Sequence, residues 1–266
     1  MPDFVLQRRE GPIAVLTLND PDRANPLSSD LVSALRRALE ETAADPQVRA
    51  VVLTGAGRHF SAGADLKALE AIGRGGGEAA NREDAENLRL LFEVLLGHPK
   101  LTVAAVHGAA VAGGCGLATA CDLVVAEAGA RFAYTEVKIG FLAALVLTFL
   151  TRRVPGHVAR RMLLDPELID GRRAVSLGLA DELAADGAAV ATAVDLALGV
   201  CAKASGSALA ATKALLNQTV GLEWREALAL AAEANVRQRS EPDCLRGVRS
   251  FLEDKTTPDW LADGDD

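Results

Sequence analysis

The chain has 266 residues, of which 50% are apolar and 24% are charged, and its formal net charge is −8. This is the composition of a globular protein long enough for one large α/β domain, or for a core with a smaller appendage. The acidic balance argues against general nucleic-acid binding, which needs a concentrated basic surface. It leaves room for one anionic ligand held by a few local cations.

The apolar and cysteine patterns argue against two further classes. The longest apolar run, residues 139–150, is too short to span a bilayer, and charged residues fill the opening MPDFVLQRRE where a signal peptide needs an apolar core. The four cysteines form no C-x-x-C pair and have no histidine at metal-ligand spacing. We therefore expect a cytoplasmic protein with reduced thiols, no metal site and no membrane partner.

The first part of the chain alternates short strands with one helix. Residues 4–9 and 13–19 carry alternating apolar positions on either side of a Gly-Pro pair, which predicts a hairpin. A helical pattern begins near Ser29 and ends at an Asp-Pro pair, and residues 49–54 then form a buried strand. The glycine-rich stretch 73–77 predicts a flexible loop, as a mobile lid or as the rim of a pocket.

The middle of the chain continues this alternation. The expected elements are an amphipathic helix over 81–96, a strand over 101–106, a short helix over 117–121, and strands over 122–127 and 131–134. Such β-α-β alternation predicts right-handed crossovers and a largely parallel sheet. From residue 156 onward the pattern is helical, which predicts a helical region packed on or beside the α/β core.

The stretch HGAAVAGGCGLATACD, residues 107–122, connects a predicted strand to the short helix. Its Gly113-Gly114 pair lets backbone N–H groups approach a ligand with no Cβ in the way, and a helix N-terminus adds a partial positive charge. We interpret the stretch as an anion-binding turn. A plain strand-to-helix turn, with glycines for close packing, is the alternative.

Three motifs in one order carry a family resemblance. GAGRHFSAGADLK, then GAAVAGGCGLATACD, then RFAYTEVKIG resemble the crotonase superfamily, also called the enoyl-CoA hydratase/isomerase family. PDRANPLSSDL, HPKLTVAAVHG and FLEDKTTPDW extend the likeness over nearly the whole chain. The resemblance implies an α/β spiral of β-β-α units over residues 1–200 and a helical oligomerisation region over 201–266. It also implies a homotrimer or a dimer of trimers, an acyl-CoA thioester as substrate, and no cofactor other than the CoA of that substrate.

The family pattern assigns two backbone donors. An enolate formed beside a thioester needs two N–H groups aimed at the developing oxyanion, and these must be held in place beforehand. By resemblance the donors are the N–H groups of Ala64 and Gly113. Asp65 follows directly within this CoA-binding loop, and we expect its carboxylate to accept N–H bonds at the start of a helix and to hold the turn.

The resemblance also implies how CoA is held. The backbone groups of Ala62 and Leu66 would meet the adenine. The candidates for the phosphates are the basic side chains Arg23, Lys67 and Lys255, the last of them from a neighbouring subunit.

The acid/base residue is the point at which the chain departs from its family. Hydratases of this family use two glutamates, and the second of them corresponds to Glu136 in AYTEVKIG. The first would stand three residues after Gly113, where this chain has Gly116. A second departure is FLAALVLTFL, residues 141–150, where many hydratases have a glycine-rich PGAGG segment; its bulkier side chains predict a differently shaped acyl pocket.

Several functions stay open on these residues. We favour an enoyl-CoA hydratase with Glu136 as general acid/base, because more of the chain resembles hydratases. YTEVKIGF and its neighbours resemble the methylglutaconyl-CoA hydratase branch, whereas the AGGC segment with no following Glu resembles isomerases. A Δ3,Δ2-enoyl-CoA isomerase needs only one carboxylate. Thioester hydrolysis and a non-catalytic acyl-CoA-binding protein are further alternatives. Glu83, Asp84 and Glu86 are carboxylates on the helix beside the acyl pocket of this family, and a solvated helix face is the simpler interpretation for them.

Overall fold

The computed structural model describes residues 3–262, apart from the side chains at 72 and 76. Its centre is a six-stranded sheet in the order β1-β2-β4-β6-β8-β11. Strands β1 and β2 form an antiparallel hairpin, and each later neighbour is parallel, which confirms the predicted hairpin and the largely parallel sheet. The strands are β1 (Val5–Glu10), β2 (Ile13–Leu18), β4 (Ala50–Gly55), β6 (Leu101–Val106), β8 (Leu123–Glu127) and β11 (Glu182–Ala184).

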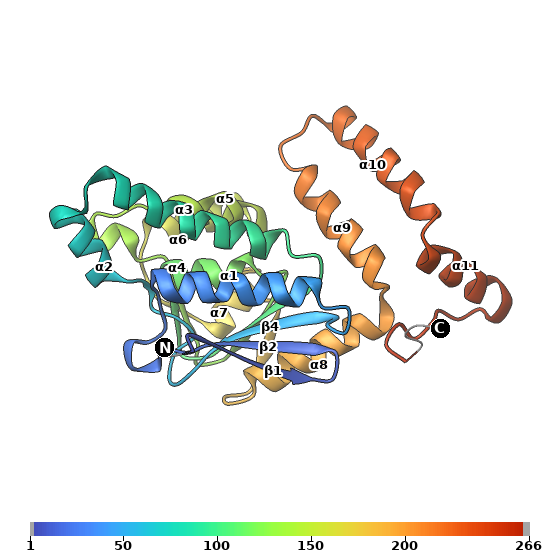
Figure 1. Cartoon of the computed structure of the whole chain (residues 1–266), viewed down its shortest axis with the longest axis horizontal. Coiled ribbons are helices and arrows are strands. Elements are labelled where there is room, and N and C mark those ends of the chain that lie inside the picture. The colour runs from blue at the N-terminus through green and yellow to red at the C-terminus, as the bar shows by residue number, and fades with distance from the viewer. Residues whose placement is uncertain (1–2, 263–266) are drawn as a thin grey trace.

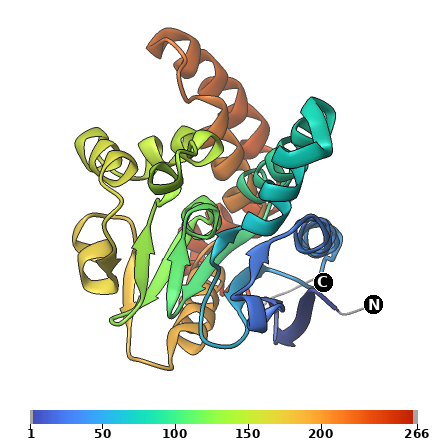
Figure 2. The same ribbon diagram turned by 90° about the vertical axis from the view of Figure 1, so that its left-hand side faces the viewer.

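Side chains alternate between two cores because successive strand residues point to opposite faces. In β2, Ile13 and Val15 pack with helix α8 (Ala189–Lys203), whereas Leu16 and Leu18 join a larger core on the other face. Figure 1 and Figure 2 show the sheet with α8 on one side and most other core helices on the other. That larger core includes residues of α1 (Ser29–Ala44), α3 (Gly77–Leu96), α4 (Gly113–Ala120), α5 (Ala144–Arg153), α6 (Gly156–Leu164) and α7 (Gly171–Ser176).

Two small sheets bring the sequence motifs together. Strand β3 (Pro26–Leu27) pairs in parallel with β5 (Gly63–Ala64), which joins the early turn to the motif GAGRHFSAGADLK. Strand β7 (Ala109–Val111) pairs in parallel with β9 (Arg131–Ala133), and β10 (Ile169–Asp170) continues this sheet. The carboxyl ends of β5, β7 and β9 therefore lead into the three segments that carry the family resemblance.

Three expectations from the sequence are wrong. The glycine-rich stretch is not a loop, because α2 (Leu66–Ala71) passes through a π-helical turn, Ile72–Gly76, directly into α3. Ion pairs one helical turn apart, Glu70 with Arg74 and Glu78 with Arg82, help to hold this segment helical. Helix α4 begins at Gly113 rather than at 117. The region after 156 also contributes two strands, β10 and β11, to the sheets.

The last helices form an arm that extends from the α/β core at the end opposite α2 (Figure 1). Its helices are α9 (Gly206–Gln218), α10 (Trp224–Arg239) and α11 (Pro242–Asp254). Helix α8, which packs on the core, ends at Lys203. The arm has no buried residues of its own and leaves large apolar side chains such as Trp224 and Leu252 more than half exposed. Within residues 3–262 no single helix is long and apolar enough to cross a membrane; α8 and α9 together would be, but they meet at 104°.

Candidate active site

Two backbone segments meet at the candidate oxyanion site. A Cβ built on Gly113 would lie 3.9 Å from the Ala64 nitrogen, so the two predicted donors lie in adjacent backbone segments. Gly63 has a φ of +83°, and a Cβ there would lie 2.6 Å from the Val111 oxygen and 3.0 Å from the Gly113 nitrogen. Only glycine fits this approach, because it tolerates positive φ and adds no side-chain atom.

The N-terminus of α4 supplies N–H groups at this point. The first bond of the helical turn is the one that the Gly116 nitrogen donates to the Ala112 oxygen, at 3.0 Å, so the N–H of Gly113 precedes the helical hydrogen-bond pattern. Ala112 has a φ of 50° and a ψ of −127°, a conformation that costs a non-glycine residue about 1–3 kcal/mol. Its N–H donates to the Ala133 oxygen at 2.8 Å, which anchors the strained residue to β9.

Asn25 holds the loop before Ala64, and sequence reasoning missed it. The residue is fully buried and its Nδ2 donates to the backbone oxygens of Ala56 (2.9 Å) and His59 (2.8 Å). In return the Ser61 hydroxyl donates to the Asn25 oxygen at 2.8 Å. Asn25 also has a positive φ of 52°, which asparagine tolerates better than most residues. The sequence gives only a weak indication of this role, namely an asparagine within a turn-rich segment.

Asp65 has the structural role expected of it. Its Oδ1 accepts hydrogen bonds from the backbone nitrogens of Lys67 (3.1 Å) and Ala68 (3.3 Å) at the start of α2. Its Oδ2 pairs with Arg23 at 2.5 Å. Burial acts to raise the pKa of the Asp65 carboxyl, but the Arg23 hydrogen bond and the helix N–H groups outweigh it, and the pKa is lowered. The carboxylate thus ties the early turn to the candidate oxyanion loop.

Glu136 is a buried carboxyl at the start of a 3-10 turn, Glu136–Ile139, directly after β9. Only 8% of the residue is exposed, and within the described part of the chain its Oε2 has no hydrogen-bond partner. Burial raises the pKa of the carboxyl, and backbone hydrogen bonds at Glu136 and Thr135 oppose this only in part. The β7–β9 pairing aligns Val111 with Ala133, so Gly113 and Glu136 follow neighbouring strand ends. An unpaired buried carboxyl with a raised pKa is suited to proton transfer.

Position 116 lies on α4, one helical turn after Gly113, and the side chains nearest to it are apolar. A Cβ built on Gly116 would lie 2.2 Å from the Val146 Cγ1 and 3.5 Å from the Phe92 Cζ. Val146 belongs to α5, within the segment that replaces the glycine-rich one of many hydratases. No side chain fits at 116 unless Val146 gives way.

Comparisons with known proteins agree with the three motifs. A family model described as enoyl-CoA hydratase/isomerase matches residues 8–262. The chain belongs to this family. A putative enoyl-CoA hydratase of Thermus thermophilus is 47% identical over 249 residues, which cover 94% of this chain and 98% of that protein. The 2,3-dehydroadipyl-CoA hydratase of Escherichia coli is 32% identical over 265 residues, which cover 98% of this chain and 99% of that protein.

Solved structures of the enoyl-CoA hydratase/isomerase family have the same fold. The crystal structure of an enoyl-CoA hydratase of Mycobacterium smegmatis superposes with a TM-score of 0.89 and 32% identity, covering 97% of this chain and 98% of that one. The predicted α/β fold with a helical C-terminal region is therefore confirmed. The finer likeness to methylglutaconyl-CoA hydratases stays a prediction.

The predicted CoA contacts of this family member fall into two groups. Arg23, Ala62, Leu66 and Lys67 lie around the loop that contains Ala64, where the Ala62 nitrogen already donates to the Ala24 oxygen at 2.8 Å. Lys255 follows α11 in the arm, and its Nζ donates to the Leu252 oxygen at 3.1 Å. Since α11 and α2 lie at opposite ends of the molecule (Figure 1), one chain does not bring Lys255 to this loop.

The three carboxylates considered on α3 differ in their surroundings. Glu83 and Glu86 are exposed, whereas Asp84 is half-buried. Burial raises the pKa of Asp84, and the negative charge of Asp65 raises it further. Asp84 thus lies close enough to the loop that contains Ala64 to interact electrostatically with it, unlike the solvated residue that we expected.

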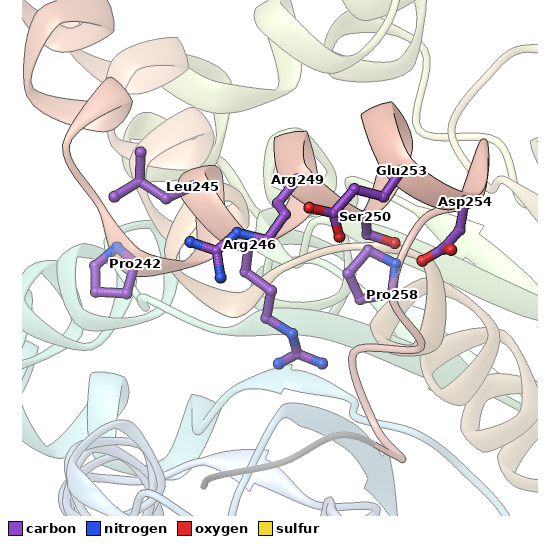
Figure 3. Close-up of a pocket in the computed structure, with 8 residues that line it drawn as sticks. All are labelled: Pro242, Leu245, Arg246, Arg249, Ser250, Glu253, Asp254 and Pro258. Carbon is purple, nitrogen blue, oxygen red and sulfur yellow. The ribbon is translucent and has the colours of Figure 1, made fainter.

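A pocket in the arm is separate from these residues. Figure 3 shows it along α11 and the segment after it, with the side chains of Arg246, Arg249 and Glu253 among those that line it. It contains none of the candidate catalytic or CoA-binding residues.

Proposed function

We propose that the chain is an enoyl-CoA hydratase that adds water across the C2=C3 double bond of an acyl-CoA thioester. The observation that carries this proposal is the Glu136 carboxyl, which is buried and, within residues 3–262, has no hydrogen-bond partner at Oε2. It follows β9, the strand that pairs with the β7 strand preceding Gly113. The names of the relatives at 47% and 32% identity support hydration as the reaction.

The residues divide the chemistry between them. The N–H groups of Ala64 and Gly113 donate to the thioester oxygen and stabilise the negative charge that develops there when water bonds to C3. Glu136 takes a proton from the water and delivers a proton to C2, for which a raised pKa is favourable near neutral pH. Proton transfer and oxyanion stabilisation require no redox centre, so we propose that the reaction uses no cofactor beyond the CoA of the substrate.

CoA recognition in this proposal involves more than one subunit. Lys67 is exposed beside the oxyanion loop and is available for a phosphate, whereas Arg23 is held by Asp65 and would have to share its guanidinium. The backbone of Ala62 and Leu66 would meet the adenine. Lys255 can contribute only from a neighbouring chain.

We propose a homotrimer or a dimer of trimers. The apolar side chains that the arm leaves exposed support this association, since exposed apolar area of this extent marks an interaction surface. They include Leu216, Trp224, Leu228, Val236, Leu245, Val248, Phe251 and Leu252.

Isomerisation of a 3-enoyl-CoA to a 2-enoyl-CoA is the second candidate. The observation that favours it is the missing side chain at Gly116, because Glu136 alone could take a proton from C2 and return it to C4. The oxyanion donors would serve this reaction equally well.

One assay separates the candidates. Purified protein is mixed with a 2-enoyl-CoA or a 3-enoyl-CoA, and the absorbance of the conjugated thioester is followed. Loss of conjugation from the 2-enoyl-CoA supports hydration, and gain of conjugation from the 3-enoyl-CoA supports isomerisation. Absence of both, with acyl-CoA still bound, would indicate a non-catalytic binding protein and overturn the proposal.

A further inference from the structure

The side chain of Tyr134 links the segment that carries Glu136 to helix α4. Tyr134 follows β9, lies two positions before Glu136, and is 1% exposed. Its hydroxyl lies 2.9 Å from the hydroxyl of Thr119, which belongs to α4 and is 4% exposed. A hydrogen bond inside the core therefore joins two of the three sequence motifs.

The direction of this hydrogen bond follows from the other partners of Thr119. The Thr119 hydroxyl donates to the backbone oxygen of Cys115 at 2.9 Å and lies 3.2 Å from that of Gly116, so its one proton is used within α4. Tyr134 is therefore the donor and Thr119 the acceptor. Burial raises the pKa of the Tyr134 phenol well above its ordinary value, and the nearby Cys115 and Glu136 raise it further, so the phenol keeps the proton that it donates.

The Glu136 carboxyl depends on its own backbone for its position. The hydrogen bonds that it accepts come from the backbone at Thr135 and Glu136, and among the described residues its Oε2 has no partner. Whatever fixes this backbone therefore also fixes the carboxyl. One such bond runs from the Ala112 nitrogen to the Ala133 oxygen at 2.8 Å, and the bond from the Tyr134 phenol attaches the chain one residue nearer to Glu136.

We propose that Tyr134 is a positioning residue, whose hydrogen bond to Thr119 sets the Glu136 carboxyl relative to the oxyanion donor at the start of α4. This inference rests on the proposed function, because it concerns how the acid/base reaches C2 of the bound thioester. The phenol itself transfers no proton in the reaction. A misplacement of about 1 Å can cost about 10²-fold in rate, so loss of this bond should slow turnover and leave binding of acyl-CoA intact.

The test removes each hydroxyl in turn and keeps the shape of the side chain. Steady-state kinetics with the enoyl-CoA that the wild type turns over are measured for Tyr134→Phe, Thr119→Val and the double variant. We expect kcat to fall by about tenfold to 10²-fold in each single variant, with KM nearly unchanged. Because both substitutions break the same bond, the double variant should be no slower than the slower single variant. Thr119→Ser keeps the hydroxyl and should restore kcat to near the wild-type value.

A matched control removes a similar hydroxyl elsewhere in the core. Thr42 on α1 is 1% exposed, donates to the Leu39 oxygen at 2.9 Å, and lies 3.3 Å from the Nε2 of His98. Thr42→Val should lower Tm about as much as Thr119→Val does, and kcat should not change. An equal fall of kcat in Thr42→Val would show that loosening the core is sufficient, and would overturn the inference.

A second background tests whether Tyr134 acts through Glu136. The proposed acid/base is absent from Glu136→Gln, so adding Tyr134→Phe to it should cost no further turnover. A further loss as large as that in the wild-type background would overturn the inference, because the phenol would then act elsewhere. An unchanged kcat in folded Tyr134→Phe would overturn it too, and both results leave the proposed function standing.

Two remaining outcomes also decide. If Tyr134→Phe does not fold, the comparison of Thr119→Val with Thr119→Ser takes its place, and equal kcat in these two variants overturns the inference. A wild type that turns over neither a 2-enoyl-CoA nor a 3-enoyl-CoA overturns the proposed function, and this inference with it.

Discussion

Replacing Glu136 by Gln removes the proposed acid/base and keeps its shape. Only 8% of the residue is exposed, and among the described residues Oε2 has no hydrogen-bond partner, so the charged form has little hydration and few hydrogen bonds in the folded state. We expect turnover to fall by about 10²- to 10⁴-fold, the usual contribution of a positioned general acid/base. Binding of acyl-CoA should persist, because the oxyanion donors are backbone groups.

The same substitution should stabilise the fold at neutral pH. The pKa of Glu136 is raised in the folded state, so the folded chain binds the proton more tightly than the unfolded chain does. The contribution of Glu136 to the free energy of unfolding is therefore greatest below the pKa of this carboxyl in the unfolded chain, and it is lost as pH rises through its pKa in the folded chain. An unsatisfied buried polar atom costs about 1–3 kcal/mol, and more when charged, so removing the charge should gain on the order of 1 kcal/mol. In a protein of this size that corresponds to a rise in Tm of about 2–4 °C.

Steady-state kinetics and thermal unfolding between about pH 4 and pH 8, a range that runs upward from the ordinary pKa of a glutamate carboxyl, check both expectations. Glu83→Gln is the control, since Glu83 is exposed on α3 and its loss should alter neither turnover nor Tm. Unchanged turnover in Glu136→Gln would refute the assignment of the acid/base. A large loss of Tm would show instead that the carboxyl has a structural role.

Three further substitutions test the loop that contains Ala64. Asp65→Ala removes the helix cap and should lower the free energy of unfolding, measured with urea at neutral pH, by about 1 kcal/mol. Because the pKa of Asp65 is lowered in the folded state, this difference from the wild type should vanish as pH falls through that pKa. Gly63→Ala places a Cβ 2.6 Å from the Val111 oxygen and should reduce turnover by about 10²- to 10³-fold, the effect of losing one oxyanion donor. Asn25→Ala leaves buried backbone oxygens without a donor and should lower the free energy of unfolding by about 1–3 kcal/mol or more. Wild-type values in any of the three would contradict the role given to that residue.

The central strands of the sheet could be predicted from the sequence because they are buried on both faces. Parallel strands covered by helices consist of nearly continuous apolar runs, and residues 101–106 are such a run, buried at every position. The start of α4 could not be predicted in this way. Gly113 and Gly114 are poor helix formers, so periodicity placed the helix later. In the structure the helix nevertheless begins at Gly113, directly after Ala112 with its φ of 50°.

The candidate site was predictable where it depends on motifs and unpredictable where it depends on contacts between distant residues. The neighbourhood of Ala64 and Gly113 follows from two glycine-bearing motifs that the resemblance pairs. Asn25 carries no such signal, since its hydrogen bonds reach backbone oxygens more than thirty positions away. The raised pKa of Asp84 likewise depends on a fold that brings α3 toward Asp65.

Gly116 stands where the family has a glutamate, and the packing around it leaves no space for a side chain. From the sequence, Gly116 and the bulky segment 141–150 are two separate departures, one removing a carboxylate and one reshaping a pocket. In the structure they compete for one volume, because the Val146 Cγ1 lies 2.2 Å from where a Cβ at 116 would be. Neither change can be reversed alone without a clash or a cavity, and a cavity left by a deleted core side chain is itself destabilising. A glutamate at position 116 therefore requires a change in both helices, α4 and α5, together.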